Sequence, residues 1–157
     1  MKKTLLIITS IYFALISSNA LSLEKGSWTF IKDSDWCYIG SLPINSDLPD
    51  SKKRGDNYIL VYKIIGSDEN IVQIEAGYKY NLDKKIIVKI DNTSFDFYST
   101  KDSSETAWTN DDGKVIYAMK KGLKLILSGE SSRGTNTNDT YSLKGFTLAI
   151  NKLNEDC

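Results

Sequence analysis

Histidine is absent from the 157-residue sequence, and cysteine is nearly so, with only two residues of that type. Without an imidazole, no histidine-dependent catalytic triad and no histidine-ligated metal site can form. The two cysteines, Cys37 and Cys157, do not form a Cys-x-x-Cys motif, which argues against a redox-active dithiol. These absences exclude several enzyme classes before any motif is considered.

An excess of positive charge is also missing, because 20 basic residues balance 20 acidic ones. Nucleic acids require a concentrated basic surface, so the charge balance argues against a nucleic-acid partner. Beyond the N-terminal segment, no apolar run approaches the ~20 residues that a membrane-spanning helix needs. We therefore expect no transmembrane segment in the mature chain.

The N-terminal segment has the pattern of a secretory signal peptide. Lys2 and Lys3 precede an apolar run over residues 5–16, and Ser18 and Ala20 place small residues just before a cleavage point. The sequence thus predicts a signal peptide over residues 1–20 and a single domain over residues 21–157. In the oxidising compartments that exported chains enter, the two cysteines are expected to join in a disulfide.

Alternating apolar and polar residues dominate the rest of the chain and predict strands. The expected strands cover residues 28–31, 36–42, 58–65, 71–80, 86–90, 95–97, 123–127 and 141–143. Apolar residues at helical spacing predict two short helices, over residues 114–121 and 146–153. This pattern indicates a mostly β fold in which two antiparallel sheets form a sandwich, with a closed barrel as the alternative.

Several patterns that could carry chemistry have simpler structural explanations. Neighbouring carboxylates could serve a hydrolase, but each such pair lies in a predicted turn or at the C-terminus, where acidic residues cap and solvate the chain. These pairs are Asp33/Asp35, Asp111/Asp112 and Glu155/Asp156. The triplet Arg54-Gly55-Asp56 matches an integrin-binding sequence, yet Gly55 is expected to shape a turn there. We predict no catalytic, cofactor-binding or metal-binding residues.

The most informative polar stretch runs over residues 129–146, between two apolar runs. Arg133 is its one large side chain, and Asp139 is the nearest partner for that guanidinium. Thr135 can hydrogen-bond to the backbone, and Gly134 permits an unusual backbone angle. We interpret the stretch as a loop braced by Arg133, Thr135 and Asp139, with a contact surface for a ligand or partner as the second interpretation.

The sequence resembles the invasion-associated locus B (IalB) family of bacteria. The resemblance rests on Ala107-Trp108, AMKKG at 118–122, GESSRGT at 129–135, DTYSLKGF at 139–146 and the final cysteine, and upstream on Trp36-Cys37-Tyr38, Arg54-Gly55, Gly77-Tyr78 and Ile90-Asp91. It implies an exported immunoglobulin-like β-sandwich of the bacterial envelope, with a role in host-cell invasion among pathogenic members. It implies no established active site.

From these observations we expect a periplasmic or secreted, envelope-associated protein that is not an enzyme and uses no cofactor. It would act by binding an envelope or host protein that the sequence does not identify. A small hydrolase using carboxylates from separate strands is the main alternative, and a carrier with a ligand cavity between its sheets is the other.

Overall fold

The computed structural model describes residues 23–157, and the predicted signal peptide over residues 1–20 lies outside that range. One sheet contains, in spatial order, β1 (Thr29–Lys32), β2 (Trp36–Ser41), β4 (Tyr58–Ile64), β5 (Ile71–Glu75) and β8 (Thr106–Trp108). The other contains β3 (Asn45–Ser46), β10 (Asn136–Ser142), β9 (Lys124–Glu130), β6 (Ile86–Ile90) and β7 (Thr93–Phe97). All neighbouring strands within the two sheets are antiparallel.

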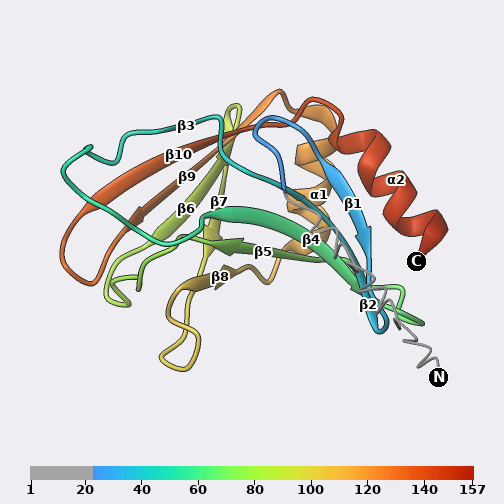
Figure 1. Cartoon of the computed structure of the whole chain (residues 1–157), viewed down its shortest axis with the longest axis horizontal. Helices are drawn as coiled ribbons and strands as arrows, with labels where there is room; N and C mark the ends of the chain where they lie inside the picture. Colours follow the sequence, from blue (N-terminus) through green and yellow to red (C-terminus); the bar gives the residue numbers. More distant parts are fainter. Residues whose placement is uncertain (1–22) are drawn as a thin grey trace, which may run out of the picture.

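The two predicted helices are present as α1 (Asp112–Lys121) and α2 (Phe146–Asp156). Helix α2 packs on β1, β2 and β4, and α1 packs on β5 and α2, so both helices lie at one end of the molecule (Figure 1). The mostly β prediction with two short helices is therefore confirmed. The short strands β3 and β8 were not predicted. Within residues 23–157 no helix is long and apolar enough to cross a membrane.

One cluster of buried side chains draws on both sheets and both helices. Val61 and Ile74 come from the first sheet, Val88 and Leu127 from the second, and Ile150 from α2, each with at most 1 % of its surface exposed. Burying an aliphatic side chain of this kind contributes about 1.5–3 kcal/mol relative to leaving it in water. The apolar residues that recur at every second position in the sequence thus mark the strand faces that are buried.

The chain passes from one sheet to the other at Gly77, where the predicted strand over residues 71–80 is interrupted. Strand β5 ends at Glu75, and Gly77 adopts a positive φ of 69° that breaks the extended path. Tyr80 then forms a bridge with Ser131, beyond the end of β9 in the second sheet. The alternation of apolar residues continues through this crossing, which is why the sequence pattern predicted one strand.

The predicted disulfide joins Cys37 in β2 to Cys157, the residue that follows α2. The two Cα atoms are 5.9 Å apart, and 120 positions separate the residues in the sequence. At its other end α2 is held by Phe146, whose ring contacts that of Trp28 edge to face with 4.8 Å between centroids. The helix is therefore held at both ends, by the disulfide to β2 and by the ring of Trp28, the residue before β1.

Candidate functional site

The polar stretch over residues 129–146 is largely a strand and not the predicted loop. Residues 131–135 form a turn, in which the Ser131 amide donates to the Thr135 carbonyl at 2.8 Å and Gly134 has a positive φ of 78°, and a second short turn over residues 143–145 leads into α2. Strand β10 follows, pairs with β9 along its whole length, and turns Thr137, Asp139 and Tyr141 into the protein. A polar strand is tolerated there because the Thr137 hydroxyl and the Asp139 carboxylate find hydrogen-bond partners.

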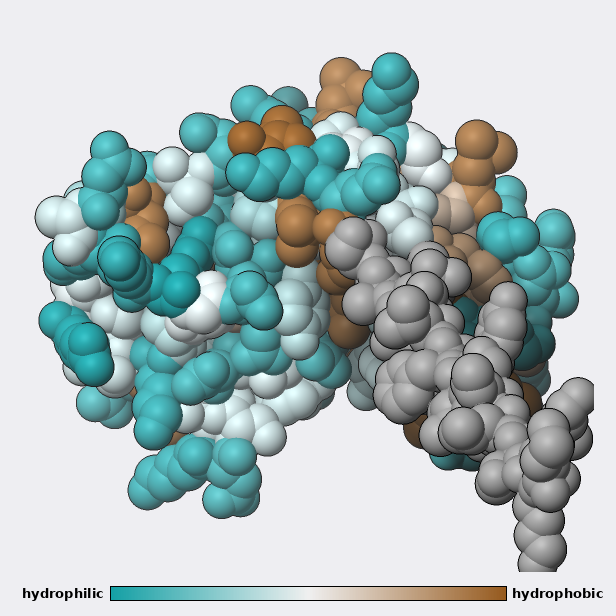
Figure 2. Space-filling view, in the orientation of Figure 1, coloured by the Kyte–Doolittle hydropathy of each residue, from teal (hydrophilic) through white to brown (hydrophobic). Residues whose placement is uncertain are grey.

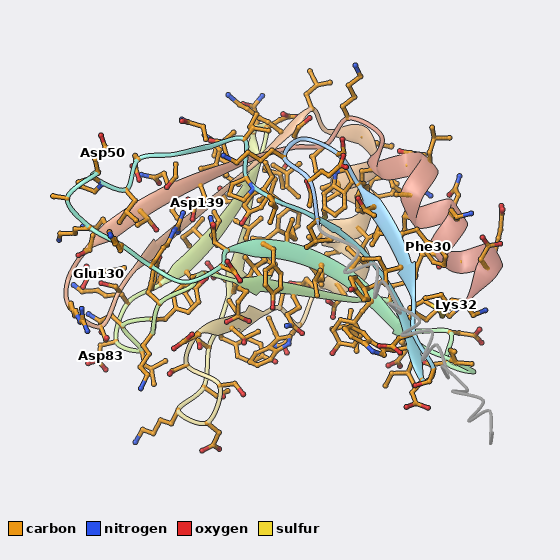
Figure 3. All side chains as sticks on the ribbon, viewed as in Figure 1. Phe30, Lys32, Asp50, Asp83, Glu130 and Asp139 are labelled. Carbon is orange, nitrogen blue, oxygen red and sulfur yellow. A yellow bond between two sulfur atoms is a disulfide. The ribbon has the colours of Figure 1, made fainter. Side chains whose placement is uncertain are left out.

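Asp139 pairs with Arg54 and not with Arg133, so that part of the prediction is wrong. The Arg54 guanidinium donates to both carboxylate oxygens of Asp139, at 2.7 and 2.5 Å. The Asp139 side chain is fully buried and that of Arg54 is 9 % exposed, whereas Arg133 is exposed in the turn. Figure 3 shows Asp139 inside the molecule, while Asp50 and Asp83 lie at its periphery. Side chains alternate between the two faces of β10, and Asp139 lies on the buried face, whereas Arg133 is exposed in the turn. Asp139 therefore pairs with Arg54.

Arg54 also ties its own loop to both sheets. The guanidinium donates to the Ser46 hydroxyl at 3.0 Å, beside β10, and to the Ala76 carbonyl at 3.3 Å, just after β5. Burial alone would lower the pKa of Arg54, but the hydrogen bonds and negative charge of Asp139 raise it above its ordinary value. Arg54 and Asp139 thus form a bidentate ion pair, the geometry that suits a guanidinium and a carboxylate best.

Three tyrosines lie close enough to this ion pair to feel the charge of Asp139. The Tyr78 hydroxyl is 2.7 Å from that of Thr137, and its ring lies edge to face with Tyr80 at 5.3 Å. Burial is the main cause that raises the pKa of Tyr78, Tyr80 and Tyr141, and the charge of Asp139 raises each further. Within residues 23–157 the hydroxyls of Tyr80 and Tyr141 have no hydrogen-bond partner. The three phenols are therefore neutral at physiological pH, and the side chains of Tyr80 and Tyr141 are buried.

Two glycines allow the Arg54 loop to approach β5 closely. The Gly55 amide donates to the Gly77 carbonyl at 2.8 Å. A Cβ atom on Gly77 would lie 2.3 Å from the Gly55 carbonyl oxygen, closer than real contacts permit. Gly77 is thus required twice, for its positive φ and for this backbone contact. The close approach brings Arg54 to the end of β5 and within reach of Asp139.

Above the ion pair lies an open groove of about 700 Å³. Its walls are the loop between β3 and β4, the segment after β5, and the turn between β9 and β10. The charged and hydroxyl side chains that line it are Ser51, Lys52, Lys53, Arg54, Tyr78, Lys79, Glu105, Ser131, Ser132, Arg133, Thr135 and Thr137. Hydrophilic residues predominate over the end of the molecule that carries this turn (Figure 2).

The groove has a positive charge that the chain as a whole lacks. Asp139 neutralises Arg54, which leaves Lys52, Lys53, Lys79 and Arg133 against the single carboxylate of Glu105. In the part of the chain that the structure describes, none of these four cations forms a salt bridge. Cations gathered in one concave site focus a positive potential and attract anions.

The structure brings together only some of the residues that the sequence singled out. Arg133 and Thr135 line the groove, and Thr135 accepts a hydrogen bond from the Lys52 ammonium at 2.7 Å. Asp139 lies beneath the groove as the partner of Arg54. Sequence reasoning missed Arg54 and the lysines; the Arg54-Gly55-Asp56 triplet was noticed, but Arg54 is buried and not presented for adhesion.

These features define a disulfide-clamped protein of two antiparallel sheets with a cationic groove at one end. The family model described as "Invasion associated locus B (IalB) protein" matches residues 43–154, and the chain belongs to that family. No curated protein matches the chain.

A solved structure gives the same fold. The crystal structure of invasion associated protein B from Bartonella henselae superposes with a TM-score of 0.53 at 15 % sequence identity. The match covers 80 % of this chain and 95 % of that one. At this identity the likeness concerns the fold alone. Within this chain, three of the motifs that carried the family resemblance contribute residues to the groove: Arg54 from the first, Gly77 and Tyr78 from the second, and Ser131, Ser132, Arg133 and Thr135 from the third.

Proposed function

We propose that the protein is an exported, non-enzymatic binding protein of the bacterial envelope, periplasmic or secreted, and that the cationic groove is its contact surface. The main observation in support is that four cations in the groove have no carboxylate partner. Cations that line a concave surface and have no carboxylate partner within the protein favour an external anionic partner. For the fold we propose the immunoglobulin-like type of sandwich, which two antiparallel sheets around a shared core support.

Two observations support an extracytoplasmic location. The disulfide between Cys37 and Cys157 favours an oxidising compartment, where such bonds persist. The structural relative from Bartonella henselae is named an invasion associated protein. We therefore propose an envelope or host component as the partner, with host-cell invasion as the setting if this organism is a pathogen.

The groove favours binding over the two alternatives. Hydrolysis by paired carboxylates needs two of them facing one cleft, and the groove contributes Glu105 as its single unpaired carboxylate. A carrier would hold its ligand between the sheets, but buried side chains such as Val61, Val88 and Leu127 occupy that space. The groove instead opens at the surface, where a large partner can reach it.

Pull-down from the envelope of the source cell tests the proposal. Arg133→Ala removes an exposed groove cation, and Lys120→Ala is the matched control because Lys120 is exposed at the end of α1, outside the groove. We expect both variants to melt with the wild type. A partner captured by wild type and Lys120→Ala but lost by Arg133→Ala supports the proposal. Capture that is insensitive to groove variants contradicts it.

A further inference from the structure

We infer that the groove recognises phosphate groups, carried by a small soluble ligand or by a lipid headgroup. This inference rests on the proposed function, because it names the chemistry that the same groove would bind. It concerns a compact ligand with two or more phosphate oxygens available at once.

The positions of the cations support a multivalent anion. Lys52 and Lys53 belong to the loop before β4, Lys79 to the segment after β5, and Arg133 to the turn before β10. The three segments are distant in sequence, so the fold alone assembles these charges around one groove. A phosphate group carries up to two charges on several oxygens and can bind more than one cation simultaneously. A carboxylate, with two oxygens and one charge, would satisfy fewer of them.

The neutral groups of the groove are suited to the same ligand. Hydroxyls of Ser51, Ser132 and Thr135 line the walls among the cations, whereas the Thr137 hydroxyl is buried and paired with that of Tyr78. A hydroxyl can donate to a phosphate oxygen, and arginine binds phosphate with two parallel hydrogen bonds. The Lys52 ammonium already rests on the Thr135 hydroxyl at 2.7 Å, which holds that cation at the wall of the groove.

The ion pair beneath the groove keeps the walls in place without competing for the ligand. Arg54 directs its guanidinium down to Asp139, Ser46 and the Ala76 carbonyl, so it anchors the segment that carries Lys52 and Lys53. A long nucleic acid would need basic surface well beyond this site, and the whole chain is balanced in charge. Lys52, Lys53, Lys79 and Arg133 lie around one groove, which favours a compact phosphate ligand.

Titration calorimetry with inorganic pyrophosphate, on the disulfide-bonded protein, tests the inference. We expect wild-type binding that weakens as salt is raised, and roughly tenfold weaker binding by Lys52→Gln/Arg133→Gln, because charge-assisted contacts are lost. Lys120→Gln/Lys124→Gln makes the same charge change at exposed positions outside the groove and should bind like wild type. Should the first variant melt early, Lys53→Gln/Lys79→Gln replaces it.

Vesicles separate the two sources of phosphate. Binding to phosphatidylglycerol vesicles but not to pyrophosphate, with the same dependence on groove variants, supports a lipid headgroup; the reverse supports a soluble ligand. Binding to neither probe, or equal losses in the control variant, overturns the inference. If a partner is still captured in an Arg133-dependent manner, the proposed function survives while its phosphate chemistry does not.

Discussion

The guanidinium of Arg54 and the carboxylate of Asp139 form a two-hydrogen-bond ion pair between residues 85 positions apart in the sequence. The pair joins the loop before β4 to the middle of β10, and the charge of Asp139 reaches three tyrosines, Tyr78, Tyr80 and Tyr141. Burying two charges costs desolvation free energy, which their attraction and hydrogen bonds must offset. Each charge is therefore tolerated only while the other is present.

Replacing Arg54 with Met should destabilise the protein by about 3–5 kcal/mol, because it leaves the Asp139 charge buried without a partner. Urea denaturation monitored by tryptophan fluorescence measures the loss. The double variant Arg54→Met/Asp139→Leu removes both charges and should be more stable than the single variant. Arg133→Met, at the exposed arginine, is the control and should change stability by less than about 0.5 kcal/mol. If Arg54→Met lost as little stability as Arg133→Met, the ion pair would contribute nothing to the stability of the fold.

Elements with a local apolar pattern could be predicted from the sequence, whereas the strand that carries Asp139 could not. Both helices and most strands were predictable, because patterns such as Val72, Ile74 and Ala76 record which face is buried. The first part of strand β10, residues 136–140, was mistaken for a loop because Thr137 and Asp139 are polar, and polar residues normally mark the surface. Their burial depends on partners in distant segments, which no local pattern contains.

The groove was harder to predict than the fold. Arg133 was singled out because it stood alone in a polar stretch, and it does line the groove. Lys52 and Lys79 resembled ordinary solvated residues, since nothing in their own segments shows that folding brings them to the same site. Strands β3 and β8 were missed for a related reason: two or three residues are too few to show a period.

Gly77→Ala should destabilise the protein more than Gly134→Ala. Both glycines have positive φ, 69° and 78°, so both variants incur the strain of a left-handed backbone, about 1–2 kcal/mol. Only at position 77 would the new Cβ also strike backbone, 2.3 Å from the Gly55 carbonyl oxygen; at 134 nothing lies within 4 Å. Thermal unfolding of the two variants isolates the clash as the difference in Tm. Equal shifts would mean that the loop moves aside freely.

Removing the disulfide in Cys37→Ala/Cys157→Ala should cost roughly 4–5 kcal/mol, because the bond closes a loop of about 120 residues in the unfolded chain. It should also loosen α2, whose C-terminal end the bond fixes to β2. Hydrogen exchange should therefore accelerate in the last turns of α2 more than in α1. A double variant within 1 kcal/mol of wild type in denaturant would contradict the entropic account.

Glu75→Gln should stabilise the protein at pH 7. Burial, aided by the charge of Glu105, raises the pKa of Glu75, while the hydrogen bond from Thr106 at 2.8 Å opposes the rise. A raised pKa means that the folded state holds the proton more tightly, so stability falls as the pH rises through this range. Glutamine keeps an acceptor for Thr106 without the charge. The advantage should disappear below the ordinary value of 4.5, where the wild-type carboxyl is also neutral, in denaturation series across pH.

Asp47→Asn should show the opposite pH dependence. Slight burial acts to raise the pKa of Asp47, but hydrogen bonds from the amide and side chain of Asn138, at 2.6 and 2.7 Å, and the charge of Arg54 lower it. The folded state therefore holds this proton less tightly, and the carboxylate stabilises the protein above the ordinary value of 3.8. That contribution is lost as the pH falls through the lower folded value. The variant should thus be less stable than wild type at pH 7, and the gap should close in acid. Asp50→Asn, at an exposed carboxylate in the same loop, is the control and should be as stable as wild type at each pH. If Asp47→Asn stays less stable than wild type in acid, the substitution disturbs packing and not charge.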